Sequence, residues 1–283
     1  MIADVKNPVV LRAMTEADLA GAIELSTEQL WPHREEDWRL FFDLGEGVVA
    51  ERDGAIVGTA MTWRFGEHFA TIGMVIVTAG EQGQGIGRMM MEALLTRLDG
   101  RSVLLNATVE GMPLYTRLGF TEIGTVWQHQ GAAPTMPLAE LIPGERVRPK
   151  GAADGCLSDL YSRASGMDRS AVFDALVSSG RTVVLSRDHE PVGFALLRRF
   201  GRGRAIAPLI APDIGGAKAL VTHWLGAHAG TFCRVDAVSE SLSSWLEEVG
   251  LPCVGTVKTM VRGPAPEVDP AICSFALAAQ ALG

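Results

Sequence analysis

Cysteine is scarce in this chain, and the cysteines present are far apart. None of the four has C-x-x-C spacing or a nearby pair of histidines: Cys156, Cys233, Cys253 and Cys273. Structural zinc sites and dithiol redox motifs depend on such spacing, so the sequence predicts no metal site and no redox centre. We expect the four cysteines to be small buried hydrophobic residues in a reducing, cytoplasmic compartment.

Positive charge and long apolar runs are also scarce. Lys and Arg total 25 against 33 Asp and Glu, which gives a net charge of −8, whereas a nucleic-acid partner requires a basic face. Residues 1–6 lack the basic and apolar segments of a secretory signal. No run reaches membrane-spanning length, because Ser274 and Gln280 interrupt the apolar tail. We therefore expect a globular protein with no nucleic-acid partner and no membrane partner.

A glycine-rich segment stands between an apolar run at 72–77 and a helical pattern that starts at Ile86. The segment reads Gln82, Gly83, Gln84, Gly85, Ile86, Gly87 and Arg88. The first N–H groups of such a helix have no intrahelical partner, and they favour a phosphate or pyrophosphate in the loop. The segment is neither a Walker loop, which ends Gly-Lys-Ser/Thr, nor a dinucleotide fingerprint, whose third glycine is replaced here by Met90.

Downstream, residues 101–109 read as a strand and residues 113–120 as a short helix ended by a glycine. The Q-x-x-G-x-G loop followed by L-Y-x-x-x-G-F resembles the GNAT superfamily of acyl-CoA-dependent N-acyltransferases. The resemblance implies that Tyr115 protonates the departing CoA thiolate. The alternative is a packed tyrosine whose hydroxyl bonds to the backbone.

The same resemblance implies an α/β fold, a mixed sheet flanked by helices that splays open beside the cofactor strand. In that splay the backbone of Met74, Val75 and Val77 would bind the pantetheine arm of acetyl-CoA, and the segment Gln82 to Arg88 would hold its pyrophosphate. The chain resembles most a bacterial tandem group whose first domain ends D-A-T-x-x-G-x-x-L-Y-x-x-L-G-F. It departs from that pattern at Asn106.

The sequence also repeats itself. Residues 48–60 align without gaps with 183–195, and residues 118–126 align with 249–257, at offsets of 135 and 131 positions. The second copy lacks the cofactor loop and has Leu246 where the first has Tyr115. We predict a catalytic domain at 1–138 and a degenerate domain at 146–283, joined by a Pro- and Gly-rich linker between residues 131 and 151. The second domain would cover the first or close its acceptor site through Asp168 and Arg169.

These patterns predict an N-acetyltransferase that transfers an acetyl group to a primary amine of a small molecule by direct attack in a ternary complex. The candidate acceptor residues are Trp31, His33, Asp37 and Trp38, because aromatic walls with a few polar groups form small-molecule pockets. The two tryptophans could instead anchor helices in the core. The sequence does not identify the general base.

Two alternatives remain open at this point. The acceptor could be a protein lysine or N-terminus, or the chain could be a non-catalytic acyl-CoA sensor. The protein would be a monomer or a homodimer, since the duplication could mimic the dimer of single-domain relatives.

Overall fold

The computed structural model describes residues 7–283. The expectation about a secretory signal rests on residues 1–6, which lie outside the described residues. The first half of the chain contains β1 (Val10–Ala13), η1 (Glu16–Asp18), α1 (Leu19–Glu28), α2 (Glu35–Leu44), β2 (Glu46–Arg52), β3 (Ala55–Phe65), β4 (Phe69–Val77), η2 (Ala79–Glu81), α3 (Ile86–Arg97), β5 (Ser102–Ala107), α4 (Met112–Arg117) and β6 (Thr121–Ala132).

The second half repeats this order of elements. It contains β7 (Glu145–Pro149), α5 (Leu157–Ser165), α6 (Ser170–Ser179), β8 (Arg181–Arg187), β9 (Glu190–Phe200), β10 (Gly203–Ala211), α7 (Ile214–Ala227), β11 (Phe232–Ala237), α8 (Glu240–Glu248), β12 (Cys253–Arg262) and β13 (Cys273–Ala276). The duplication read from the sequence is therefore present in the fold, and β13 is an addition of the second half.

The two aligned hairpins have the same turn. Asp53 and Gly54 both have left-handed φ values, +54° and +79°, and Asp188 and His189 repeat them at +48° and +76°. Two consecutive left-handed residues are typical of a type I′ turn, whose twist matches that of the flanking strands. The second copy keeps the backbone conformation even though His189 replaces the glycine.

All the strands join one mixed sheet in the order β1-β2-β3-β4-β5-β12-β6-β11-β13-β10-β9-β8-β7. Strand β12 of the second half pairs with β5, and β6 of the first half pairs with β11, so each half gives one strand to the other. Where β6 pairs with β11, Trp127 lies opposite Ala237. Where β12 pairs with β5, Lys258, which is the repeat equivalent of Trp127, lies opposite Ala107. The exchange is therefore symmetric, and the sheet is continuous across the molecule.

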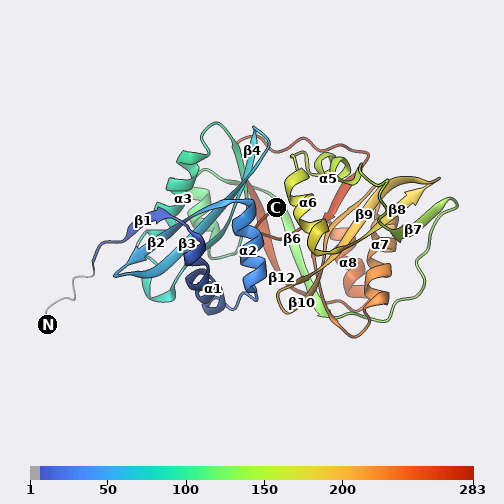
Figure 1. Cartoon of the computed structure of the whole chain (residues 1–283), viewed down its shortest axis with the longest axis horizontal. Helices are drawn as coiled ribbons and strands as arrows, with labels where there is room; N and C mark the ends of the chain where they lie inside the picture. The colour runs from blue at the N-terminus through green and yellow to red at the C-terminus, as the bar shows by residue number, and fades with distance from the viewer. Residues whose placement is uncertain (1–6) are drawn as a thin grey trace.

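The helices form two layers. Residues of α1, α2, α5 and α6 pack in one central core shared by both halves, and α2 and α6 face each other near the middle of Figure 1. Helices α3 and α4 cover the other face of the first half, and α7 and α8 cover that of the second half. A shared central core places side chains of both halves around whatever lies between them.

The predicted linker is shorter than expected. Residues 131 and 132 still belong to β6, and β7 occupies Glu145–Pro149, because both segments find strand partners. Within the predicted linker, residues 133–144 and residues 150 and 151 are neither helix nor strand. The domain limits at 138 and 146 stay a prediction.

The cysteines also differ from expectation. Cys233 is buried in β11, whereas Cys156 and Cys273 are exposed and Cys253 is half-buried. Cys156 lies at the N-terminal end of α5, and Cys253 and Cys273 are the first residues of the strands β12 and β13. Residues at the ends of elements pack less tightly than those inside them, so only Cys233 behaves as a core residue.

Candidate active site

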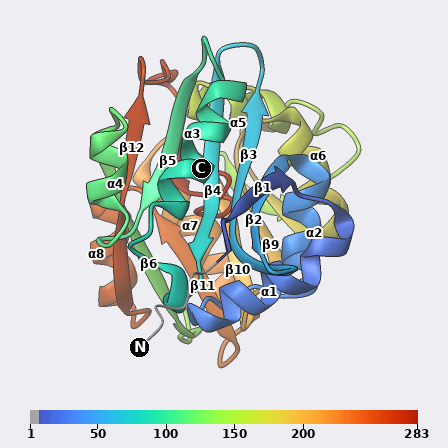
Figure 2. The same cartoon turned by 90° about the vertical axis from the view of Figure 1, so that its left-hand side faces the viewer.

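The sheet opens between β4 and β5. The two strands are parallel and pair only from Phe69–Thr71 to Ser102–Leu104. Beyond these residues they diverge around a cleft of about 780 Å³. Figure 2 shows α3 in front of the two strands. The cleft is lined by β4 from Ile72 to Val77, the glycine loop, Asn106 and Tyr115. The predicted splay is confirmed.

The glycine loop ends at the N-terminus of α3. Gly85 is the N-cap with φ +83°, and Gly83 has φ +77°, both in the left-handed region that side chains disfavour. A Cβ atom at either position would meet no protein atom within 4 Å. The loop backbone and the first N–H groups of α3 therefore face open space, as the sequence predicts.

The side chains of the loop are bound within the protein. The amide of Gln82 donates to the Val77 carbonyl at 3.0 Å, and Gln84 bonds to Glu81 and Arg52. Gln84 does not line the cleft, and Arg88 pairs with Glu92 one helical turn on. Gln82 lines the cleft and its amide has a second N–H donor, so its contact with an anion stays a prediction. Its amide stiffens the turn between strand and helix.

Tyr115 lies in α4 and lines the cleft with only 8% of its surface exposed. Its ring packs edge-on against Phe120, and a Cβ at Gly111 would come within 2.8 Å of it. Burial raises the pKa of the hydroxyl to about 12, so it stays protonated at neutral pH. Among the described residues none hydrogen-bonds this hydroxyl, so the backbone-bonded alternative does not hold.

A second pocket lies on the other side of the opening. It has a volume of about 320 Å³ and meets the cleft at five shared residues: Trp31, Gly73, Met74, Asn106 and Thr108. We call it the acceptor pocket. Trp31 and His33 from the first half line it together with Phe200, Arg202, Arg234 and Gln280 from the second half. The pocket is complete only where the two halves meet.

His33 lies among aromatic rings in the wall of this pocket. Its ring is edge-on to Trp31, Trp38, Phe41 and Phe200 at centroid distances of 5.6 to 6.5 Å. Burial, with the nearby Arg234, lowers its pKa to about 4, so the imidazole is neutral at pH 7. Within residues 7–283 the Nδ1 atom has no hydrogen-bond partner.

Asp37 and Trp38 do not line the acceptor pocket. Trp38 is fully buried and donates through Nε1 to Ser26, so it anchors α2 in the core. Asp37 is 1% exposed and accepts bonds from Arg34 and from the backbone N–H of Gly201. The assignment of both residues to the acceptor wall is corrected, because the helical period of α2 turns them inward.

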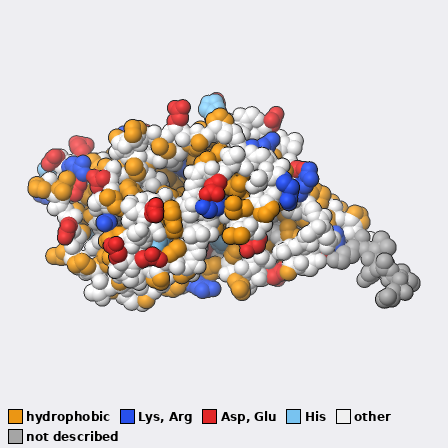
Figure 3. Space-filling model, turned by 180° about the vertical axis from the view of Figure 1, so that it is seen from behind, with side chains coloured by type: hydrophobic (Ala, Val, Ile, Leu, Met, Phe, Trp, Pro, Cys, Tyr) orange, Lys and Arg blue, Asp and Glu red, His pale blue; other side chains and the backbone are white. Residues whose placement is uncertain are grey.

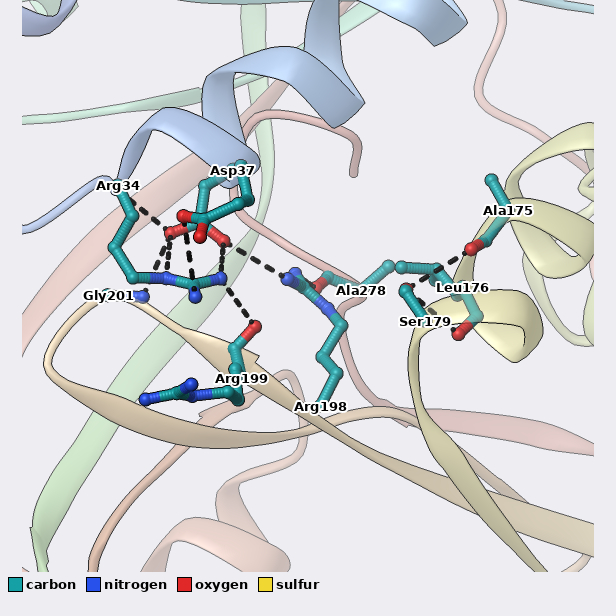
Figure 4. Close-up of polar contacts among 10 residues, drawn as sticks. Arg34, Asp37, Ala175, Leu176, Ser179, Arg198, Arg199, Gly201 and Ala278 are labelled. Atoms are coloured by element: carbon teal, nitrogen blue, oxygen red, sulfur yellow. Dashed lines mark hydrogen bonds and ion pairs between the residues drawn. The ribbon is translucent and has the colours of Figure 1, made fainter.

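The carboxylate of Asp37 joins the two halves (Figure 4). Its Oδ1 lies 3.8 Å from Arg198, which is buried and also donates to the Ala278 carbonyl. The bonds from Arg34 and Gly201 keep the pKa of Asp37 below its usual range despite the burial that opposes this. The contact therefore holds α2 against β9 and the loop that follows it.

The second half contributes residues that sequence reasoning missed. Arg202, Arg234 and Gln280 carry no recognisable motif, and only the fold brings them to the first half. Asp168 and Arg169, which were expected to reach the acceptor, are elsewhere: Asp168 bonds to Ser170 at the start of α6, and Arg169 is buried outside this pocket. Asn106, where the chain departs from its resemblance, donates to the Gln280 carbonyl.

The equivalent opening in the second half is filled by the chain itself. Strands β10 and β11 pair only at Arg204 and Ala205, and β13 then lies between them. Leu209, the repeat equivalent of Val75, pairs with Ala276 of β13. The edge of β4 thus borders an open cleft, whereas the equivalent edge of β10 forms sheet hydrogen bonds with β13.

Acidic and basic groups are interspersed on the face seen in Figure 3, without a continuous patch of either sign. In the described part of the chain, no group of three or more His, Cys, Asp or Glu side chains is placed to hold a metal ion. No helix among residues 7–283 is long and apolar enough to cross a membrane.

Known proteins match both halves. A model of the acetyltransferase (GNAT) domain matches residues 43–122, and another matches residues 157–271. The uncharacterized N-acetyltransferase YitH of Bacillus subtilis is 29% identical over 244 residues, which are 83% of this chain and 85% of that protein.

Solved structures share the fold over nearly the whole chain. A Pyrococcus horikoshii protein assigned as an acetyltransferase has a TM-score of 0.80 at 18% identity, covering 97% of this chain and 96% of that one. A GCN5-related N-acetyltransferase from Sphaerobacter thermophilus has a TM-score of 0.64 at 14% identity, over 92% and 97% of the two chains.

A mixed sheet opened between two parallel strands, with a glycine loop at a helix N-terminus beside the opening, defines an N-acyltransferase of the GNAT type. The family models agree with this geometry in both halves. The chain belongs to the GNAT acetyltransferase superfamily, is an acyltransferase enzyme, and carries two GNAT domains in tandem.

Proposed function

We propose that this protein transfers an acetyl group from acetyl-CoA to the primary amine of a small molecule by direct attack in a ternary complex. The observation that carries the proposal is the opening through the sheet between β4 and β5. The cleft and the acceptor pocket meet there at shared residues that include Met74, Asn106 and Thr108. Two reactants that enter from opposite sides are held together without a covalent enzyme intermediate.

The glycine loop fits the pyrophosphate of acetyl-CoA, the usual cosubstrate of GNAT acetyltransferases. The N–H groups of Ile86, Gly87 and Arg88 have no partners within α3, and the space over Gly83 and Gly85 is open. A loop of this kind accommodates an anion close to the backbone. When bound, acetyl-CoA supplies the thioester carbonyl that the amine attacks and the thiol that leaves.

The exposed edge of β4 fits the pantetheine arm. Beyond Thr71 this strand has no strand partner on its β5 side, so the backbone of Met74, Val75 and Val77 is proposed to bind the arm as an added strand. The Met74 carbonyl is fixed by the Thr59 hydroxyl at 2.9 Å. The edge is therefore ordered before the arm binds, which lowers the entropic cost of binding.

Tyr115 is proposed as the proton donor to the leaving sulfur. Its hydroxyl borders the cleft, has no partner among the described residues and stays protonated at neutral pH. A proton donor within hydrogen-bond reach of a leaving group contributes about 10²- to 10⁴-fold to a rate. The tyrosinate would then recover a proton from water.

The acceptor pocket favours an amine that also carries an anionic group. Arg202 and Arg234 line it, and no carboxylate does among the residues that the structure describes. Asp236 offsets the charge of Arg234, but Arg202 has no ion-pair partner in the described chain. A polycationic acceptor would meet this uncompensated positive charge, whereas an amine with a carboxylate would offset it.

The proton of the acceptor amine is proposed to leave through water. The five shared residues include no carboxylate, and the low pKa of His33 makes it a poor acceptor for a proton from an amine of pKa about 10. Only the neutral amine attacks, so kcat/KM should rise with pH up to the pKa of the amine.

Calorimetric titration with acetyl-CoA, followed by release of free thiol with a panel of amines, tests the proposal. The panel pairs amino acids with their amides and with diamines of equal length. Binding with thiol release that favours the amino acids supports the proposed acceptor class. Failure of acetyl-CoA to bind would overturn the assignment of the glycine loop.

Two other functions are compatible with the fold, and the same titration and thiol-release assay distinguishes them. A protein acetyltransferase would be favoured if free thiol is released with lysine-containing or N-terminal peptides but with none of the small amines. Binding without release from any acceptor would favour an acyl-CoA sensor. The small-molecule reading is preferred because the acceptor pocket is enclosed by side chains of both halves.

A further inference from the structure

A cavity of about 450 Å³ lies between the halves, outside the proposed transfer site. Its walls come from β5, β6 and β12, from α5, and from the segment that leads into β13. Most of the lining is apolar, including Leu104, Ile123, Ala164, Met167 and Ile272. Nothing in the proposed acetyl transfer uses this space.

The cavity occupies the place in the second half that the acceptor pocket occupies in the first. The N-terminal parts of the two halves correspond at an offset of 136 positions. The evidence is a matching ion pair: Arg12 donates two hydrogen bonds to Asp18, and Arg148 donates two to Asp154. At the same offset, Leu30 and Gly166 both have left-handed φ values, +59° and +67°.

The lining residues correspond in the same way. Trp31 and His33 of the acceptor pocket have Met167 and Arg169 as their equivalents, and both of these line the cavity. On the exchanged strands the acceptor pocket uses residues 254–257, and the cavity uses residues 123–125, which are the equivalents of 254–256. The second half has therefore kept an acceptor-like pocket, although β13 fills the opening where a cofactor would lie.

Two buried polar side chains give the cavity its chemistry. Arg169 is 2% exposed, donates to Ser165 and the Leu282 carbonyl, and has no carboxylate partner among the described residues. Tyr161 is also 2% exposed, and its hydroxyl has no hydrogen-bond partner within residues 7–283. A buried cation without a counter-ion and an unpaired hydroxyl both cost folding free energy that an oxygen ligand would recover.

We propose that this cavity is a second, non-catalytic binding site for an apolar carboxylic acid. The apolar walls would hold the hydrocarbon body, and the guanidinium of Arg169, with the Tyr161 hydroxyl, would receive the carboxylate. No acyl transfer takes place there, because the opening between β10 and β11 is filled by β13. Asn106 and Gln280 line both this cavity and the acceptor pocket, so the ligand lies next to the transfer site.

Calorimetric titration of the intact protein with straight-chain carboxylates from butyrate to octanoate tests the site. Acetyl-CoA is present at saturation, and the matched primary amides serve as controls. We expect affinity to rise about fourfold per methylene group and to be at least tenfold weaker for the amides. Carboxylates that do not bind, or that bind no better than their amides, would overturn the proposal.

Variants test whether the carboxylate binds in this cavity or in the acceptor pocket. Arg169→Met removes the charge and keeps most of the volume, and Val268→Asp places a negative charge at an exposed lining residue without disturbing the core. Each should weaken octanoate binding at least tenfold, whereas Leu138→Asp, at an exposed residue outside the cavity, should not.

If Arg169→Met does not fold, Val268→Asp decides the question alone. Octanoate binding that survives Val268→Asp and is lost in Arg234→Gln would place the ligand in the acceptor pocket and refute the inference. Because the readout is equilibrium binding, the outcome is independent of whether acetyl transfer to a small amine is detected.

Discussion

At the scale of single residues, Tyr115 and His33 lie on opposite sides of the opening, and burial shifts their pKa values in opposite directions. Burial keeps the hydroxyl of Tyr115 protonated, and it keeps the imidazole of His33 unprotonated. Because burying a charge is costly, burial widens the pH range over which each group is neutral.

The first residue-scale prediction concerns Tyr115→Phe. We expect kcat to fall about 100-fold or more while the Kd for acetyl-CoA changes less than twofold, because only the proton donor is removed. Steady-state thiol release and calorimetry measure the two quantities. Unchanged turnover would remove Tyr115 from the mechanism.

The second prediction concerns pH and His33. The unfolded state binds a proton at His33 near pH 6.5 and the folded state only near pH 4, so stability falls as the pH drops between these values. The shift corresponds to about 3 kcal/mol. Urea denaturation at pH 7 and pH 4.5 should show most of this loss in the wild type and a smaller loss in His33→Phe. Equal losses in both proteins would contradict the assignment.

At the scale of elements, the sequence predicted what short-range chemistry determines. The two hairpins, the turn at Asp53 and Gly54, the strand before the glycine loop and the helix after it all follow from local patterns. The strand exchange does not, because pairing of β12 with β5 joins residues more than 150 positions apart and leaves no local mark. For the same reason Arg234 could not be placed beside Trp31 from the sequence.

The sequence also did not show which residues of α2 are buried in the core and which line a pocket. Asp37 and Trp38 were chosen for their residue types, which suit a pocket wall as well as they suit a helix anchor. Which of the two applies depends on which face of α2 packs against β9 and the loop that follows it. That packing joins segments far apart in the sequence. Trp31 and His33 precede α2 and keep their place at the pocket.

The prediction at this scale concerns the glycine loop. Gly85→Val should weaken acetyl-CoA binding at least tenfold, because its side chain enters the open space over the α3 N-terminus. Gly100→Val is the matched control, since Gly100 has a similar φ of +80° and equally open surroundings away from the cleft. Both should lose about 1–2 kcal/mol of stability. Calorimetry with acetyl-CoA should separate them, and equal affinities would contradict the assignment of the loop.

At the scale of the whole molecule, the two halves are held together by the exchanged strands, the shared core and the contact of Asp37 with Arg198. The acceptor pocket exists only in this assembled arrangement. A half that has lost its cofactor opening is therefore still needed to build the site of the other half.

The prediction at this scale concerns Asp37→Ala. It leaves the buried Arg198 without its nearest carboxylate, and removal of one partner of a buried ion pair costs about 3–5 kcal/mol. Denaturant unfolding should show this loss in Asp37→Ala and a change within about 0.5 kcal/mol in Asp43→Ala, which alters an exposed carboxylate of the same helix. A small effect of Asp37→Ala would show that the halves do not depend on this contact.

The strand exchange also sets an order of events during synthesis. Both neighbours of β6, the strands β11 and β12, belong to the second half, so β6 has no partner when it leaves the ribosome. About 100 residues separate the end of β6 from the start of β11, which at about 5–20 residues per second is a wait of about 5–20 s. The nascent first half spends that time with an unpaired sheet edge at β5, open to chaperones or to another nascent chain.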